Sequence, residues 1–482
     1  MAATEKYEIV VGLEVHAQLL TASKAYNTDP TSFGEDPNAY VGLVTLALPG
    51  TLPKANTKVV DYALRMGLAI GSTITRYNFY DRKNYFYPDL PKGYQITQDK
   101  TPICRGGFID IALKDGTEKR IGVTRIHMEE DAGKSLHLPG APETLIDLNR
   151  AGTPLIEIVS EPDMRSAEEA YAYLVEVHRL VRYLGICDGN MEEGSLRCDA
   201  NISVRPRGQA AFGKKVEVKN MNSFRNVARA IERETARQIE LLEAGQEIVS
   251  ETRMFDGGTG DTYSLRSKES LNDYRYFPEP DLQPVIVDDA RLERVRAELP
   301  ALPKELFALF TTEHGLSAYD AGVLIEERET AEYYLAVTKL TPQYKAAANW
   351  ITGPLKALQN STARSLHELG LSAEHLAELI GLIEGGKVSF SVASQRLLPV
   401  LVETGEPPMQ AAVRLNLIMD QDSAGLAPII AEIMGRYPDK VAEYKAGKKG
   451  LLGLFVGEVM KATKGKANPK EANRLVTEAL EA

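Results

Sequence analysis

The sequence predicts an α+β protein, with a largely antiparallel N-terminal sheet domain followed by two all-helical domains. Before residue 290, several segments alternate apolar and polar residues and are joined by short turns. After residue 290 the apolar spacing becomes helical and is interrupted by prolines and glycines. A second break, GEPPM, falls at residues 405–409. We therefore expect domains at residues 1–290, 291–407 and 408–482.

The first expected strand is YEIVVGLEVHAQL, which places Val11 and Val15 on one face and Glu14 and His16 on the other. The segment FIDIALKDGTEKRIGVTRIHMEE is expected to form a hairpin around Asp115-Gly116. LRCDANISVRP and KKVEVKN alternate in the same way. Two helices are expected among these strands, one from a Ser166 N-cap to Gly185 and one over residues 223–245.

The composition excludes several classes of protein. The chain of 482 residues is 44% hydrophobic, enough for a sizeable core, and no run approaches the roughly 18 apolar residues of a membrane span. The N-terminus lacks the pattern of a signal peptide. Cys104, Cys187 and Cys198 have neither metal-ligand nor disulfide-framework spacing, so we expect a reducing cytoplasm. Because the net charge is −11, any contact with nucleic acid requires a local basic patch.

The polar faces of the expected strands carry an unusual density of charged and polar residues. Such a face is either solvated or the floor of a site. Because five strands share the pattern and few flexible Lys–Glu surface pairs occur, we favour a site. Its candidate residues are Glu14, His16, Arg125, His127, Glu129, Arg197, Asp199, Asn201, Glu217 and Lys219.

Glu157 lies inside the apolar run LIEIV, where a carboxylate must be paired, protonated or bound to metal. One interpretation is an ion pair with Arg150. The other makes Glu157 a metal ligand together with Glu14, His16 and Glu129. Three carboxylates and one imidazole suit a hard divalent ion, and Mg²⁺ is the usual choice where phosphates also bind. Spacing by itself does not identify this site.

Residues 81–98, DRKNYFYPDLPKGYQITQ, are aromatic and basic and have almost no aliphatic side chains. We expect an irregular loop, because the composition suits neither a core strand nor an amphipathic helix. The sequence has neither the G-x-G-x-x-G motif of dinucleotide sites after a strand nor the G-x-S-x-G motif of serine nucleophiles. Gly133-Lys134-Ser135 resembles the end of a P-loop, but Met128 stands where that motif needs its first glycine. No cysteine is in a setting that would activate a thiolate, so a glutaminase centre is not expected.

Lysines concentrate near the C-terminus, between residues 440 and 470. A charge run of this kind is usually a solvated helical face. In an acidic protein, lysines gathered in one small domain also suit contact with a phosphate backbone. The sequence leaves both interpretations open.

Five segments together closely resemble the B subunit of the tRNA-dependent amidotransferases: DRKNYFYPDLPKGYQITQ, DLNRAGTPLIEIVSEPD, MEEGSLRCDANISVRP, VEVKNMNSFRNVARAIERE and DYRYFPEPDLQP. The resemblance covers essentially the whole chain. It implies a catalytic domain similar to those of glutamine synthetase and the guanido kinases. It also implies a C–N ligase that phosphorylates the side chain of Glu-tRNA(Gln) or Asp-tRNA(Asn) with ATP. Ammonia from a glutaminase, the amidase or A subunit, then completes the amide, and a small C subunit completes the heterotrimer.

The resemblance also implies roles for individual residues. Glu14, His16, Glu129 and Glu157 would hold Mg²⁺. Catalytic roles would fall to Lys83, Asp199 and Lys219, and contacts with ATP to Lys83, Tyr85, Lys92, Tyr94 and Arg197. The alternative for the segment 81–98 is a hydrogen-bonded loop packed on the sheet. The tail would bind tRNA through Lys448, Lys449, Lys461, Lys464 and Lys466.

The chain departs from the family at one place. Many relatives carry a zinc motif, C-x-C followed by C-x-x-C, where this sequence reads Asn27-Thr28-Asp29 and Gly42-Leu43-Val44-Thr45. Zinc is therefore not expected, and the sequence does not indicate what stabilises residues 25–45.

Two other functions compete with that of a phosphorylating subunit. The first is a non-catalytic subunit that presents tRNA to an active site elsewhere, but the chemistry-bearing residues of the sheet disfavour it. The second is a self-contained amide ligase that uses free ammonia on a small acid, but the tail lysines and the resemblance to a tRNA family disfavour that.

Overall fold

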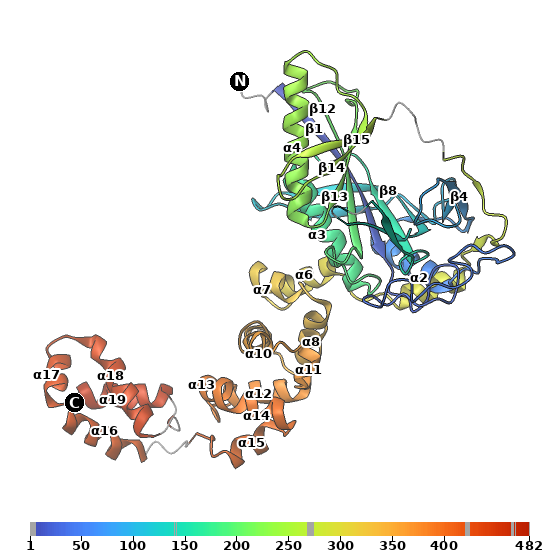
Figure 1. The fold of residues 1–482 in the computed structure, drawn as a ribbon. Coiled ribbons are helices and arrows are strands. Elements are labelled where there is room, and N and C mark those ends of the chain that lie inside the picture. The colour runs from blue at the N-terminus through green and yellow to red at the C-terminus, as the bar shows by residue number, and fades with distance from the viewer. Residues whose placement is uncertain are drawn as a thin grey trace. The chain divides into compact units, whose positions relative to one another are not determined.

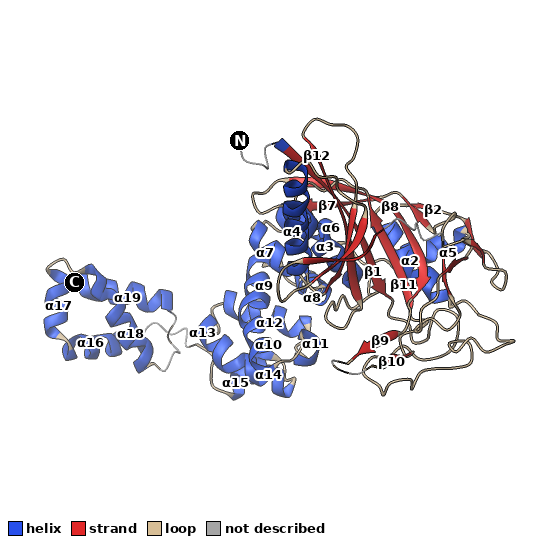
Figure 2. Ribbon diagram, turned by 45° about the horizontal axis from the view of Figure 1, so that its top comes forward, coloured by secondary structure: helices blue, strands red, loops and turns tan. Residues whose placement is uncertain are grey.

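The computed structural model describes residues 6–138, 140, 142–267, 274–419, 425–463, 467 and 469–481. The chain forms two compact units, Met1–Leu302 and Pro303–Ala482. All the named strands belong to the first unit, and the second is built from helices (Figures 1 and 2). This arrangement confirms the predicted α+β class with helical regions after the sheet.

A ten-stranded sheet forms the first unit, in the order β15-β14-β13-β12-β1-β11-β8-β6-β2, with β7 paired to β8. Every pair is antiparallel except β13–β14, which are parallel and are connected through helix α4. The strands are β1 (Tyr7–Gln18), β2 (Thr73–Ile74), β6 (Cys104–Arg105), β7 (Phe108–Ala112), β8 (Glu118–Glu130), β11 (Pro154–Ser160), β12 (Leu196–Pro206), β13 (Val216–Met221), β14 (Glu251–Phe255) and β15 (Thr262–Ser267).

Three helices pack on the apolar face of this sheet: α2 (Thr57–Ala69), α3 (Ala167–Tyr183) and α4 (Phe224–Glu243). Alternate residues of the strands, such as Val11, Val15 and Ile158, are fully buried against them. The predicted helix starts are confirmed, since the Ser166 and Ser223 side chains each accept a backbone hydrogen bond as N-caps. The opposite face of the same strands is therefore left for polar side chains.

The sequence predicted one of two hairpins and missed the other. The β7–β8 hairpin is confirmed, with Gly116 at φ 85° in its turn. The prediction that segment 81–98 is an irregular loop is wrong at its two ends, which form paired strands of a small sheet. The backbone N–H of Ile96 donates to Glu130 Oε1 at 2.9 Å, which fixes this pairing against the end of β8. The small sheets contain β4 (Asp81–Asn84), β5 (Tyr94–Thr97) and β16 (Phe277–Pro278); β3 (Tyr77–Asn78) and β17 (Val285–Ile286); and β9 (Lys134–His137) and β10 (Thr144–Asp147).

The first unit extends past the predicted boundary at residue 290. Helix α5 (Asp289–Ala297) packs on α2, where Arg291 and Arg294 both hydrogen-bond to Asp61 at 2.8–3.1 Å. Leu292 and Val295 join the core of the sheet domain. Apolar spacing predicted this helix but could not show which domain it packs against.

The second unit is helical throughout its named elements. They are α6 (Pro303–Thr312), α7 (Ala318–Leu324), α8 (Arg328–Thr338), α9 (Tyr344–Trp350), η1 (Ile351–Leu355), α10 (Lys356–Thr362), α11 (Leu366–Leu369), α12 (Ala373–Glu384), α13 (Phe390–Val392), η2 (Ala393–Leu397), α14 (Leu398–Thr404), α15 (Pro408–Arg414), α16 (Leu426–Arg436), α17 (Pro438–Lys445), η4 (Lys449–Leu451), α18 (Leu452–Ala462) and α19 (Pro469–Glu481).

Helices α16 to α19 share a hydrophobic core that includes Phe455 and Val459, which lie four residues apart on one face of α18. The domain boundary predicted at 407/408 stays a prediction. Of the helices that the structure describes, none is both long and apolar enough to cross a bilayer.

A buried carboxylate fastens α4 to the edge of the sheet. Glu234 on α4 is fully buried and accepts two hydrogen bonds from Arg237, at 2.8 and 2.9 Å. It also accepts one from Thr262 of β15 at 3.3 Å and lies 3.5 Å from Arg253 of β14.

We expect Glu234→Ala to lower the stability of β14 and β15 by about 1–3 kcal/mol, because Arg237 and Arg253 lose one of their two carboxylate partners and keep only Glu251. Hydrogen exchange of the β14 and β15 amides measures this change. Glu232→Ala on the exposed face of the same helix is the matched control. Equal protection in both variants would contradict a structural role for the buried carboxylate.

Candidate functional site

The polar face of the sheet brings residues of five adjacent strands into one patch. Across β1, Glu14 lies opposite Asp199 of β12, and His16 lies opposite Glu157 of β11. Glu157 in turn lies opposite His127 of β8, so that His16, Glu157 and His127 form a row, and Glu217 of β13 lies opposite Asn201 of β12. Strand pairing thus assembles residues that are up to about 200 positions apart in the sequence.

His16, Glu129 and Glu157 form the first group of the site. The Nε2 atom of His16 lies 3.3 Å from Glu157 Oε2 and 3.5 Å from Glu129 Oε1. One donor atom from each residue can be chosen so that all lie within 4.8 Å of one another. Two carboxylates and an imidazole at this spacing could hold a hard divalent cation.

The charges of this first group stabilise one another. Burial acts to lower the pKa of His16, but the charges of Glu157 and Glu129 outweigh it and raise that pKa to about 9. Burial acts in the opposite direction on Glu157, but His127 and His16 hold the pKa of that carboxyl well below its usual range. The group is therefore an anion-rich site whose charges are compensated within the protein.

Glu14, Asp199 and Glu217 form a second group, also within 4.8 Å of one another. Lys219 binds Asp199 and lies 3.1 Å from Glu217, while Asn201 donates to Glu14 at 2.8 Å. Among the described residues, Glu14 therefore groups with Asp199 of β12 and Glu217 of β13, and the predicted set of four metal ligands that joins it to His16 stays a prediction. Burial and the charge of Glu157 raise the pKa of Glu14.

Lys83 lies beside the first group on strand β4. Its ammonium stands 4.9 Å from the centre of the Tyr274 ring and 5.9 Å from that of Tyr85. Burial acts to lower the pKa of Lys83, but the charge of Glu129 contributes to a net rise. Tyr85 also packs edge-on against Tyr274, with ring centres 6.2 Å apart. Lys83 and Tyr85, which were both predicted to contact ATP, therefore lie beside the first group, and the rings of Tyr85 and Tyr274 flank the Lys83 ammonium.

Three other predicted ATP contacts are already engaged. Lys92 pairs with Glu130, and the Arg82 guanidinium covers the Tyr94 ring at 4.1 Å. Arg197 donates to Asp131 at 2.8 Å.

Arg150 was one candidate partner for Glu157. It lies 3.6 Å from Asp131 instead, and its guanidinium donates to the carbonyls of Ala132 and Gly133. Within the described part of the chain, the proposed Arg150–Glu157 ion pair is not formed.

His127 contacts the first group but was not among the predicted ligands. Its Nε2 atom lies 3.3 Å from Glu157 Oε2 and 3.7 Å from Glu129 Oε2. Burial acts to lower the pKa of His127, but those carboxylates raise it to about 8. Alternation along β8 had placed this imidazole on the polar face. The cross-strand register that brings it to Glu157 could not be read from the sequence.

The loop at residues 25–45 is held by hydrogen bonds among the four residues at which the resemblance implied a zinc motif. Asp29 Oδ2 accepts from the backbone N–H of Gly42 at 2.8 Å and from the Thr45 hydroxyl at 2.7 Å. Asn27 Nδ2 donates to Thr45 Oγ1 at 3.0 Å, and Asn27 Oδ1 accepts from the Asp29 N–H at 2.8 Å. A Cβ atom at Gly42 would collide with Asp29. We call these four residues the loop clasp.

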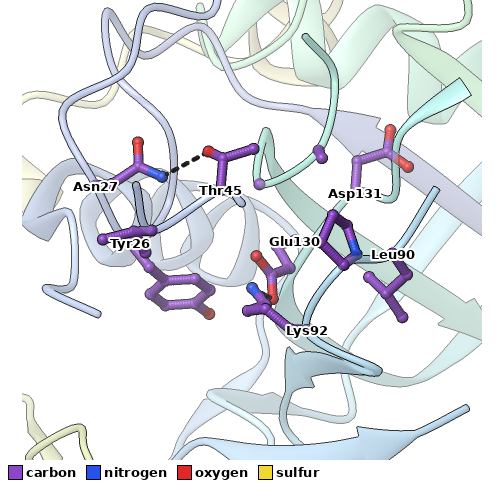
Figure 3. Close-up of a pocket in the computed structure, with 11 residues that line it drawn as sticks. Tyr26, Asn27, Thr45, Leu90, Lys92, Glu130 and Asp131 are labelled. Atoms are coloured by element: carbon purple, nitrogen blue, oxygen red, sulfur yellow. Dashed lines mark hydrogen bonds and ion pairs between the residues drawn. The ribbon is translucent and has the colours of Figure 1, made fainter. Parts of the chain in front are cut away.

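A fully buried lysine supports the loop clasp. Lys24 Nζ donates to the Tyr40 carbonyl at 2.7 Å and lies 3.9 Å from Asp29 Oδ2. Burial lowers the pKa of Lys24 to about 8. The clasp borders a small pocket whose other wall holds Lys92 and Glu130, with Asn27 and Thr45 above them in Figure 3.

The predicted tRNA-binding lysines that the structure describes are all exposed. Lys448 lies 3.1 Å from Glu443, Lys449 lies 3.4 Å from Glu481, and Lys461 lies 3.9 Å from Glu458. Such exposed ion pairs are weak and exchange readily for other anions. Lys464 and Lys466 lie outside the described residues.

Comparison with known proteins gives matches over nearly the whole chain. The GatB/GatE catalytic domain family matches residues 9–293, and the GatB domain family matches residues 332–480. A protein of Synechococcus sp. (strain JA-2-3B'a(2-13)) is 50% identical over 484 residues, covering 99% of each chain. Proteins of Geobacter sp. (strain M21) and Pseudomonas putida (strain W619) are each 49% identical, covering 99% of this chain and 100% of the relative. All three are named as the B subunit of aspartyl/glutamyl-tRNA(Asn/Gln) amidotransferase.

We expect Asp29→Ala to destabilise residues 25–45 by about 2–3 kcal/mol, because the Gly42 N–H and the Thr45 hydroxyl lose their acceptor and the buried Lys24 ammonium loses a nearby negative charge. Hydrogen exchange of the Gly42 amide and the rate of proteolysis in this loop are the measurements. Glu35→Ala, at an exposed acid of the same loop, should leave both unchanged. An Asp29→Ala loop as protected as the native one would refute the clasp.

Proposed function

Because the chain belongs to the family of aspartyl/glutamyl-tRNA(Asn/Gln) amidotransferase B subunits, we propose that its polar sheet face phosphorylates a mischarged aminoacyl-tRNA. The substrate would be the side-chain carboxylate of Glu-tRNA(Gln) or Asp-tRNA(Asn), and ATP the phosphoryl donor. The observation that carries the proposal is the buried group of His16, Glu129 and Glu157 beside Lys83. Charge of both signs at one sheet surface suits phosphoryl transfer, where catalysis is mainly positioning and electrostatics.

The chemistry explains why ATP is needed. A carboxylate resists ammonia because its oxide is a very poor leaving group. In the first step, a carboxylate oxygen attacks the γ-phosphorus of ATP, and the bond to ADP breaks. In the second step, ammonia attacks the acyl carbon and loses a proton, and inorganic phosphate leaves. The products are Gln-tRNA(Gln) or Asn-tRNA(Asn), ADP and phosphate.

His16, Glu129 and Glu157 are the residues that would hold Mg²⁺, which neutralises phosphate charge when bound. Lys83, kept charged near Glu129, would face the transferred phosphoryl group as a second positive charge. Lys219 is held by Asp199 and Glu217, so it would present its ammonium in a fixed position. Glu14 would complete the acidic surface from the second group.

The remaining nucleotide contacts depend on exchange of existing partners. Tyr85 lies beside Lys83 and could stack on adenine or on the terminal base of tRNA. Lys92, Tyr94 and Arg197 could contact ATP only after releasing Glu130, Arg82 and Asp131 respectively. We therefore give Lys83 and Tyr85 the leading role at the nucleotide.

Ammonia would come from another polypeptide. All three cysteines are buried and free, and burial raises the pKa of Cys104 and Cys187 to about 12, which opposes a thiolate nucleophile. We propose a cytoplasmic heterotrimer in which the amidase, or A subunit, supplies ammonia and the small C subunit completes the assembly. The relatives' name, which designates a B subunit, supports a complex of several chains.

A non-catalytic, tRNA-presenting subunit is the second candidate, supported by the exposed tail lysines. The two candidates differ in one observable, because only the first needs the buried first group for turnover of ATP.

We expect Glu157→Gln to reduce Glu-tRNA-dependent ATP turnover by about 100-fold or more, because the carboxylate lost is the one shared by His16 and His127. The assay combines the complete complex, glutamine, Mg²⁺, γ-labelled ATP and Glu-tRNA(Gln), and measures phosphate and Gln-tRNA. Glu118→Gln, at an exposed acid at the start of β8, is the control. Full turnover by Glu157→Gln would favour the presenting role instead.

We expect the triple variant Lys448→Ala/Lys449→Ala/Lys461→Ala to weaken tRNA binding and to lower the salt dependence of the affinity by about one unit of slope per lost phosphate contact. Titration of tRNA at several salt concentrations measures both. Lys339→Ala/Lys356→Ala, at two exposed lysines outside the tail, should change neither. An unchanged slope in the triple variant would mean that these lysines are only a solvated surface.

A further inference from the structure

We propose that His127 is a positioning residue that orients the carboxylates of Glu157 and Glu129 for a divalent cation, without ligating it. The inference rests on the proposed function of the same site. It assigns a role to a residue that the strand pattern had placed on the polar face but that was not among the predicted metal ligands.

Strand register places His127 directly beside Glu157, on the adjacent strand. His16, Glu157 and His127 occupy facing positions on β1, β11 and β8, so that the carboxylate has an imidazole on either side. Both Nε2 atoms lie 3.3 Å from the same oxygen, Glu157 Oε2. The row is symmetric in composition, but its two histidines differ in exposure and in partners.

His16 is the imidazole that can reach a cation. Its side chain is 19% exposed, and its donor atom belongs to the group that lies within 4.8 Å. The His127 side chain is only 4% exposed and lies outside that group. The greater exposure of His16 to solvent therefore favours it as the cation ligand, and His127 is a buried neighbour of the two carboxylates.

The polar contacts of His127 point only to the site. Its Nε2 atom meets Glu157 and, at 3.7 Å, Glu129, while its Nδ1 atom is buried and has no hydrogen-bond partner among the described residues. An imidazole kept in the interior for structural reasons would be expected to use both nitrogens. Here the unsatisfied nitrogen is tolerated, and the satisfied one is directed at two candidate ligands.

A positioning role follows from the behaviour of carboxylate ligands. A carboxylate that binds a cation through one lone pair can still rotate, and a hydrogen bond from a neighbouring side chain removes this freedom. His127 Nε2 is placed to supply that hydrogen bond to Glu157 and a weaker contact to Glu129. Loss of such an outer partner typically costs about 10–100-fold in metal affinity.

The test measures Mn²⁺ binding to the full-length protein by electron paramagnetic resonance, without ATP or tRNA. We expect His127→Leu to weaken Mn²⁺ binding about 10–100-fold, and His127→Gln, which keeps an N–H donor, to recover much of the loss. In the assembled complex, the Mg²⁺ concentration for half-maximal turnover should rise by a similar factor, while KM for tRNA is unchanged. His137→Leu, at an exposed histidine on β9, is the control.

Each outcome decides the proposal. Native Mn²⁺ affinity in His127→Leu would overturn it, and so would complete loss of binding in both variants, since that would make His127 a ligand. If His127→Leu does not fold, the test compares His127→Gln with His127→Asn. The longer Gln side chain can place an N–H near the position of His127 Nε2, and the shorter Asn side chain cannot. Native Mn²⁺ affinity in His127→Asn with weaker binding in His127→Gln would therefore overturn the role of His127 as a donor. Failure of the wild-type protein to bind Mn²⁺ would instead overturn the proposed cation site itself.

Discussion

The two-faced geometry of long antiparallel strands is the constraint on which the rest of the structure depends. Residues two apart on a strand share a face, so burial of Val11, Val15 and Ile158 under α2, α3 and α4 forces Glu14 and His16 onto the other face. The same rule acts on all five central strands. The hydrophobic core therefore fixes the orientation of the candidate site, and a register shift of one residue would bury the charges and expose the core.

Compensation within the protein makes this concentration of acids tolerable. Glu157 lies between two imidazoles, Asp199 and Glu217 share Lys219, and Asp131 is bound by Arg197. These cations come from the strands of the same sheet, so charge pairing and strand pairing support each other. An incoming cation or phosphate would meet carboxylates and ammonium groups whose positions are already set, which lowers the cost of ordering them.

The loop clasp is a second polar cluster whose groups are compensated within the protein, here mainly by hydrogen bonds. Asn27, Asp29, Gly42 and Thr45, at the positions where the resemblance implied a zinc motif, are joined by hydrogen bonds centred on the Asp29 carboxylate and the Thr45 hydroxyl. The fully buried Lys24 places its ammonium 3.9 Å from the Asp29 carboxylate and so adds a compensating positive charge. The clasp borders the pocket that Lys92 and Glu130 line, so the loop lies next to the end of strand β8 (Figure 3).

The sequence by itself determined which residues share a face, where α3 and α4 begin, the β7–β8 hairpin and the family. Each of these depends on local spacing or on motifs that need no knowledge of neighbours. Only the tertiary structure decided that Glu14 joins Asp199 and Glu217, that His127 meets Glu157, that Arg197 is engaged by Asp131, and that the ends of segment 81–98 pair. Alternation tells on which side of a strand a residue lies, but the choice of adjacent strand and the cross-strand register are long-range, and these set the partner of every charge.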